Sequence, residues 1–106
     1  MTVKDKINAK IKNAGLYYNG HYRHYTFRVE LETRGGGASI EFPVERTEEF
    51  MEMFENDLDI ENGVFASDLA GVPVVLGTEA RFGKIIAIGN ILADEDEFMD
   101  LTKDGE

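Results

Sequence analysis

A run of carboxylates in the middle of the chain has the residue types and the spacing that could do chemistry. Nine Asp and Glu residues lie between Arg46 and Arg81, and no Lys or Arg interrupts them. Carboxylates without basic neighbours can coordinate a cation, transfer a proton or attract a basic protein. Seven of the nine are close together in the sequence: Glu48, Glu49, Glu52, Glu55, Asp57, Asp59 and Glu61.

The second half of this run invites comparison with a calcium-binding loop. With Asp57 as position one, Asp59 and Glu61 occupy positions three and five. However, the glycine that such loops need at position six falls at position seven, as Gly63, and position twelve is Asp68 where a bidentate Glu is required. We therefore interpret the segment as a solvated acidic loop and predict no metal site and no cofactor.

Other catalytic arrangements find little support. His21 and His24 are three residues apart, so on a strand they point to opposite faces and do not share a metal. The glycines at 35–37 precede neither a helix nor a phosphate-binding lysine, and no G-x-S-x-G or H-E-x-x-H motif occurs. The paired carboxylates lack a partner base or electrophile. We expect no enzymatic activity.

The elements that must position the carboxylates are organised around residues 21–42. Tyr25, Phe27, Val29 and Leu31 occupy every second position, which is the period of a strand with one buried face. The same alternation returns at Ala38, Ile40 and Phe42. The three glycines between the two runs tolerate the positive φ angles of a reversal, so we predict a long antiparallel hairpin.

Two shorter elements precede this hairpin. Val3, Ile7 and Ile11 are spaced like one stripe of a helix, so we predict a basic amphipathic helix over roughly 3–13, capped by Thr2 and docked on the sheet. Asn19-Gly20 then favours a two-residue type I′ turn between a short first strand and the long one.

A second helix is predicted over the acidic run, from Glu48 to about Asn56. Thr47 is a suitable N-cap, and Glu48 and Glu49 complement the helix dipole in the first turn. Acids three or four positions apart on a helix stand about 5–6 Å apart at their Cβ atoms, which resembles the phosphate spacing of one nucleic-acid strand. The expected buried face comprises Phe50, Met51, Phe54 and Leu58.

The last part of the chain adds further strands. Residues 67–71 read as a single helical turn, and 72–76 and 83–88 as two strands. An acidic block at 94–97 then suggests a frayed tail, although Phe98, Met99 and Leu101 could form a short docking segment. We therefore predict one α+β domain over 1–106, with an acidic tail from about 94. Its antiparallel sheet has about five strands, with two helices packed against it.

Composition and charge narrow the class of protein. There are no cysteines, no leader and no apolar run of about 20 residues, so we expect a cytoplasmic protein that does not enter a membrane. Residues 1–34 carry seven Lys/Arg against three acids, a net charge of +4, whereas residues 35–106 carry four against eighteen, a net charge of −14. The acidic surface should repel nucleic acid and attract basic proteins.

Three motifs resemble those of small uncharacterised proteins from phages and mobile elements. They are the glycine-rich hairpin at 35–37, the D-L-A-G-V-P-V strand entry at 68–74 and the closing I-A-I-G-N-I-L-A-D at 86–94. The similarity covers about residues 22–96. It implies an anti-CRISPR-like setting, in the cytoplasm of a host cell, because small acidic phage proteins are often inhibitors of host defence or of host nucleic-acid machinery.

The favoured hypothesis is an inhibitor that binds a basic host protein, such as a CRISPR effector nuclease, without binding nucleic acid itself. The seven clustered carboxylates would meet its Lys and Arg residues, and Tyr17, Tyr18 and Tyr22 would anchor the contact. One alternative is a nucleotide-binding sponge that uses the tyrosines with Arg23 or Arg28. Another is an assembly protein, a homo-oligomer held by its two oppositely charged ends.

Overall fold

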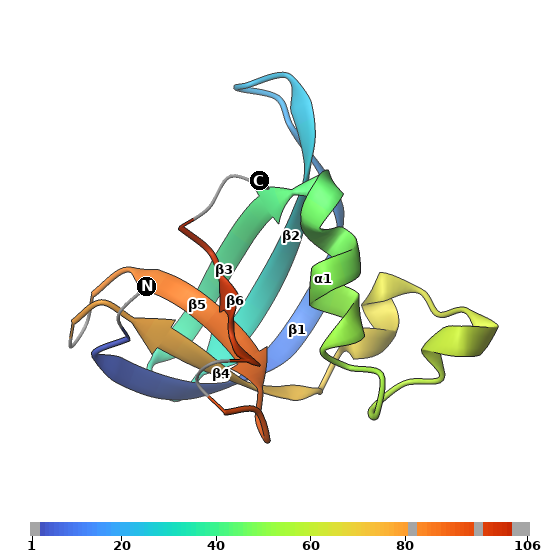
Figure 1. Ribbon diagram of the computed structural model, residues 1–106. Coiled ribbons are helices and arrows are strands. Elements are labelled where there is room, and N and C mark those ends of the chain that lie inside the picture. The colour runs from blue at the N-terminus through green and yellow to red at the C-terminus, as the bar shows by residue number, and fades with distance from the viewer. Residues whose placement is uncertain (1–2, 81–82, 95–96, 103–106) are drawn as a thin grey trace.

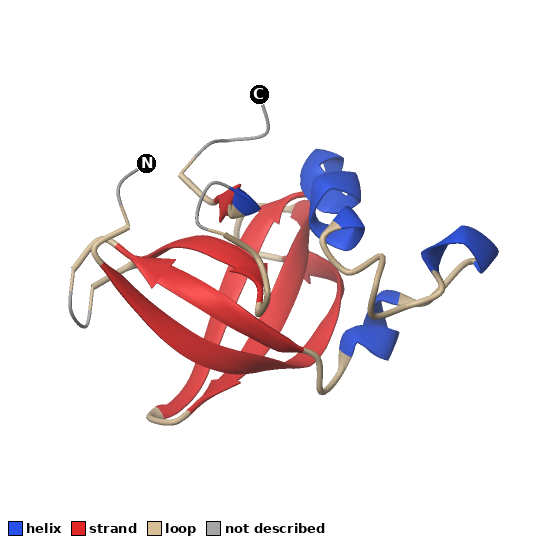
Figure 2. Cartoon of the chain, turned by 60° about the horizontal axis from the view of Figure 1, so that its bottom comes forward, coloured by secondary structure: helices blue, strands red, loops and turns tan. Residues whose placement is uncertain are grey.

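The computed structural model describes residues 3–80, 83–94 and 97–102. Within these residues the chain forms a six-stranded antiparallel sheet with the strand order β3-β2-β1-β4-β5-β6 (Figure 1). The sheet is strongly curved, so that it resembles an open barrel (Figure 2). The strands are β1 (Asp5–Asn19), β2 (His24–Thr33), β3 (Gly36–Pro43), β4 (Pro73–Thr78), β5 (Ile85–Asn90) and β6 (Met99–Asp100).

Helical structure is sparse, and most of it in the described residues lies between β3 and β4. One α-helix, α1 (Thr47–Glu52), is accompanied by three short 3-10 helices: η1 (Val44–Arg46), η2 (Ile60–Asn62) and η3 (Ala66–Leu69). The α+β prediction is therefore confirmed in outline, with one strand more and one helix fewer than we expected. None of the helices in the described residues is both long enough and apolar enough to cross a bilayer.

The predicted N-terminal helix is wrong, because this segment is the long strand β1. Ile7, Ala9 and Ile11 also fit a period of two, and they face the core, while Asn8 and Lys10 between them are exposed. The apolar spacing alone allows either structure. Pairing decides between them, since β1 bonds to β4 through 5–10 and to β2 through 9–19. A register shift between Ile11 and Asn13 bends the strand where it passes from one partner to the other.

The central hairpin is confirmed. Phe27, Val29 and Leu31 of β2 are buried and stand opposite Phe42, Ile40 and Ala38 of β3. Its turn places Gly36 at φ 128°, a conformation that side chains rarely allow. Tyr25 differs from the prediction, because its side chain is 56% exposed. The hairpin of β1 and β2 runs past the end of the core at this point (Figure 1).

The turn between β1 and β2 is longer than the predicted two residues. Asn19 pairs with His24, which leaves a four-residue loop over 20–23. Asn19 still directs the reversal, because its side-chain Oδ1 accepts hydrogen bonds from the backbone N–H groups of His21 and Tyr22 at 3.1 and 3.3 Å. The left-handed residue is Arg23, with φ 56°, and not the glycine.

The predicted acidic helix is present but ends after Glu52, four residues early. Thr47 is its first residue and not its cap, and the Thr47 hydroxyl donates to the carbonyl of Val44 at 2.6 Å. Beyond Glu52 the chain continues as turns. The carbonyl of Met53 accepts a hydrogen bond from the side chain of Asn90 at 3.0 Å, so it is engaged outside the helical ladder.

One large core lies on the inner side of the sheet. Phe50 of α1 packs against Phe27 and Phe42 with ring centroids 5.5 and 5.3 Å apart, and Phe54 packs against Phe50 at 5.2 Å. Leu69 of η3, within the single turn predicted at 67–71, is fully buried beside them. The short helix α1 is therefore held by aromatic burial more than by its own length.

A second, smaller apolar cluster covers the outer side of β4 and β5. Its buried members are Val75, Ala87 and Phe98. Phe98 lies directly on Gly89, where a Cβ atom would stand 2.3 Å from the ring. The next residue, Met99, is buried and begins β6, which pairs with β5. The docking segment that we considered at 98–101 thus binds the chain's own sheet, and the predicted acidic block at 94–97 includes two residues that are not described.

Candidate partner-binding surface

The seven clustered carboxylates are all exposed, but they do not form one ridge on a helix. Three of them lie on α1 and the other four on the turns and on η2 that follow it. This acidic segment, 48–61, starts over the sheet and continues into a loop that projects from the barrel (Figures 1 and 2). The acids therefore follow a curved path along the chain, and the regular phosphate-like spacing of the prediction is lost after Glu52.

Glu49 differs from its six neighbours because it is ion-paired. Arg46, whose side chain is only 7% exposed, donates from Nη2 to both carboxylate oxygens of Glu49 at 2.9 and 3.0 Å and from Nε at 3.1 Å. It also donates to the backbone carbonyl of Asp100 in β6. Glu49 therefore belongs to a structural contact between α1 and the last strand, and it contributes little negative potential to the surface. We predicted it as a partner-binding residue, and the pairing weakens that role.

The remaining acids are not neutralised by the basic N-terminal segment. In the described part of the chain, the pair of Arg46 and Glu49 is the only ion pair that involves any of the seven carboxylates. Lys4, Lys6, Lys10 and Lys12 are exposed along β1 and its start, and the amine of Lys6 lies 5.8 Å from the ring centre of Phe98. The negative charge of the acidic segment is thus open to a partner.

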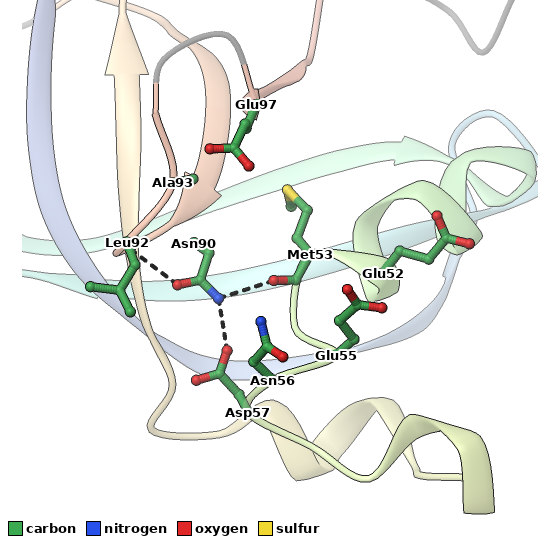
Figure 3. A pocket seen from close by; sticks show the side chains of 9 residues that line it. All are labelled: Glu52, Met53, Glu55, Asn56, Asp57, Asn90, Leu92, Ala93 and Glu97. Atoms are coloured by element: carbon green, nitrogen blue, oxygen red, sulfur yellow. Dashed lines mark hydrogen bonds between the residues drawn. The ribbon is translucent and has the colours of Figure 1, made fainter.

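A cleft forms where the acidic segment meets the end of β5. It has a volume of about 340 Å³ and is lined by four carboxylates together with the side chains of Met53 and Leu92. Asn90 fixes this junction: its Nδ2 atom donates to the carbonyl of Met53 and, at 2.7 Å, to Oδ2 of Asp57 (Figure 3). The four carboxylates belong to Glu52, Glu55, Asp57 and Glu97.

Our predicted site included neither Glu97 nor Asn90, the acid and the hydrogen-bonding amide that β5 and the residues after it bring to this cleft. Glu97 belongs to the block expected to be a tail, and it comes to the cleft because Phe98 and Met99 anchor the residues after it. Asn90 appeared in the sequence analysis only as part of the closing motif at 86–94. An Asn at the end of a strand is a common turn signal, so nothing in the sequence distinguished its structural role.

The cleft has the chemistry to accept a cationic side chain. Carboxylates on opposite walls, with apolar side chains between them, suit the long side chains of Lys and Arg, which combine an apolar stem with a charged end. Among the described residues, no three His, Asp or Glu side chains are grouped so that they could hold a metal ion.

The predicted tyrosine anchors lie elsewhere. Tyr17, Tyr18 and Tyr22 are at the end of the β1–β2 hairpin, at the top of Figure 1, whereas the acidic segment extends to the lower right. The structure therefore separates the predicted site into two surfaces. Both are exposed, since the tyrosines have 41%, 52% and 68% of their surface accessible.

Arg28, proposed for a small-ligand pocket, is already occupied. Its Nη1 atom donates to Oε1 of Glu41 at 2.6 Å, and its guanidinium stands 4.8 Å from the ring centre of Tyr17. The hollow beside it measures about 80 Å³, whereas small-molecule sites usually exceed about 300 Å³. The form of the sponge alternative that uses Arg28 therefore has little support, whereas Arg23 lies at the exposed tip of the hairpin.

These surfaces define a small α+β domain with an acidic loop segment at one place and an aromatic hairpin end at another. The chain matches no known protein family, no curated protein and no solved structure.

Proposed function

We propose that the protein is a non-enzymatic inhibitor whose acidic segment, 48–61, occupies the cationic nucleic-acid groove of a host protein. A CRISPR effector nuclease is the partner class that the phage-like resemblance suggests, and the host cytoplasm is where it would act. In this role the exposed carboxylates pair with the Lys and Arg residues that otherwise contact phosphates, so nucleic acid is excluded from the groove.

The exposure of the unpaired carboxylates is the observation that supports this proposal most directly. Six of the seven are exposed and have no ion-pair partner among the described residues, and the cleft adds Glu97 to them. Like charges this close repel one another, so the arrangement has a cost that a cationic partner would relieve. Asn90 also supports the proposal, because its hydrogen bonds to Met53 and Asp57 hold the middle of the acidic segment in place before binding. An ordered surface loses less entropy on association than a flexible one.

The test is competition with nucleic acid on a purified, guide-loaded CRISPR effector nuclease. The protein should displace labelled target DNA, and the apparent affinity should fall steeply as salt is added, because the contacts are ionic. Reversing two charges, in Glu52→Lys with Glu55→Lys, should weaken inhibition about tenfold or more, since each exposed pair contributes about 0.2–1 kcal/mol and reversal replaces attraction by repulsion.

A matched control separates the site from the overall charge. Glu30→Lys with Glu32→Lys changes the net charge by the same amount on exposed positions of β2, far along the chain from the acidic segment. This control should inhibit almost as well as the unchanged protein. Inhibition that survives the Glu52 and Glu55 reversal, or that both double variants lose equally, would remove the proposed mechanism.

A further inference from the structure

We propose that the end of the β1–β2 hairpin binds single-stranded nucleic acid by stacking unpaired bases on its tyrosines. This goes beyond the proposed function and uses a different surface. The charge of the whole chain led us to expect no direct binding of nucleic acid. The outer part of the hairpin, however, has basic residues and no acidic ones in its sequence.

The first observation is the charge of the hairpin. In the outer part of the hairpin, from Gly15 to Val29, the chain contains no Asp or Glu, whereas it contains Arg23, Arg28 and both of its histidines. Arg23, His21 and His24 are exposed at the tip. The acidic segment begins on α1 and extends away from the tip (Figure 1), and charges farther apart than about 8 Å are largely screened at physiological salt. The tip can therefore attract phosphates although the protein as a whole is acidic.

The second observation is the exposure of aromatic rings. All four tyrosines of the chain lie in this hairpin. Tyr18, Tyr22 and Tyr25 are 52%, 68% and 56% exposed, which is unusual for side chains that could have been buried. Tyr18 stands opposite Tyr25 in the register of the two strands, so both rings lie on one side of the hairpin. Exposed aromatic rings beside basic residues are the usual platform for unpaired bases, because every base has a face that can stack.

The third observation is that the rings are held in place. Tyr18 and Tyr25 meet edge to face with centroids 5.0 Å apart, and His21 and Tyr22 do so at 4.7 Å. The two hydrogen bonds accepted by Asn19 order the loop that carries His21 and Tyr22. Rings fixed in this way lose little freedom when a base stacks on them.

Tyr17 has a different role. The guanidinium of Arg28 covers its ring at 4.8 Å, and Glu41 fixes that guanidinium at 2.6 Å. This ring is therefore in use within the protein. The stacking residues are Tyr18, Tyr22 and Tyr25, and Arg23 supplies the phosphate contact at the tip.

The absence of tryptophan gives a direct measurement. Tyrosine fluorescence arises from this hairpin alone, because the four tyrosines are all there and the chain has no Trp. Titration with a short oligothymidylate at physiological salt, where the distant acidic charges are screened, should quench this emission, and a labelled copy of the same oligonucleotide should show increased anisotropy. A duplex of equal length should bind more weakly, since its bases are already stacked on one another.

Substitutions identify the residues involved. Tyr22→Ala and Tyr25→Ala should each weaken oligothymidylate binding about fivefold or more, whereas Tyr22→Phe, which keeps the ring, should bind like the unchanged protein. Arg23→Ala should weaken binding and make it less dependent on salt, because one phosphate contact is lost. Phe65→Ala is the matched control: Phe65 is an aromatic residue that is 79% exposed next to the acidic segment, and its loss should change nothing.

One variant distinguishes a failure of the hairpin proposal from a failure of the proposed function. Glu52→Lys with Glu55→Lys should leave oligothymidylate binding intact, so either proposal can fail while the other stands. The hairpin proposal is overturned if oligothymidylate neither quenches tyrosine emission nor binds at physiological salt. It is equally overturned if binding persists unchanged in a folded variant that combines Tyr18→Ala, Tyr22→Ala and Tyr25→Ala, or if the hairpin variants affect only the binding of a protein partner.

Discussion

Replacing Gly89 by alanine should release the C-terminal segment from the sheet. A Cβ atom at this position would stand 2.3 Å from Cδ1 and 2.6 Å from Cε1 of Phe98, so the ring must leave its place. Phe98 is only 8% exposed, and re-exposing a buried Phe side chain costs about 1.5–3 kcal/mol. Because Met99 pairs with Ile88 in the next position, loss of the ring contact should also loosen β6.

The effect of Gly89→Ala should depend on the presence of Phe98. In the unchanged protein we expect the substitution to lower the free energy of unfolding by about 2–3 kcal/mol. In a Phe98→Ala background the clash is gone, and alanine in a strand should then be neutral or stabilising by about 0.5–1 kcal/mol. Urea unfolding of the four proteins in this cycle measures the coupling between the two positions.

The assay has a clear negative outcome. If the free-energy losses of Gly89→Ala and Phe98→Ala simply add in the double variant, the two residues do not interact, and the placement of Phe98 on Gly89 is wrong. Gly15→Ala is the matched control on β1, because a Cβ atom there meets nothing within 4 Å. It should leave the stability within about 1 kcal/mol of the unchanged protein.

Two further substitutions test the contacts that hold the acidic segment. Asn90→Ala removes the hydrogen bonds to the carbonyl of Met53 and to Asp57. Urea unfolding should therefore show a loss of about 1–3 kcal/mol in the free energy of unfolding, and hydrogen exchange should accelerate over 53–62. The control Asn62→Ala removes one exposed hydrogen bond to Asp59 and should cost less than about 1 kcal/mol. Arg46→Lys cannot reproduce the forked contact with both oxygens of Glu49 and should cost about 1–3 kcal/mol, and a stability equal to that of the unchanged protein would show that the buried guanidinium has no structural role.

The central hairpin was predictable because its signal is local. Phe27, Val29 and Leu31 alternate with polar residues, and the glycines after them allow a reversal, so pattern and turn chemistry agree. The N-terminal segment was not predictable in this way. Ile7 and Ile11 fit both a helix and a strand, and the choice depends on β4, whose residues come more than sixty positions later.

The sequence indicates which acidic residues are exposed at the candidate site, but not how they lie relative to one another. The exposure of the carboxylates follows from their charge. The pairing of Glu49 with Arg46 is a local contact between residues three positions apart, and their spacing could have indicated it. The approach of Glu97 and the short length of α1 depend on contacts with β5 and β6, and such long-range contacts leave no local pattern. The separation of the tyrosines from the acids has the same origin, because it follows from how far the β1–β2 hairpin extends past the core.

The sharing of β1 by two partner strands has a consequence for how the protein reaches its native state. Its first half bonds to β4 and its second half to β2, so the strand at the centre of the sheet is complete only after the chain has been made as far as residue 78. During synthesis the β1–β2–β3 meander can form early. The half of β1 that pairs with β4 has no partner strand until β4 has been made. Proteins dominated by such distant pairings fold slowly, in about milliseconds to seconds. A chain truncated before β4 should accordingly be a substrate for chaperones, because it exposes an unpaired strand edge to other molecules.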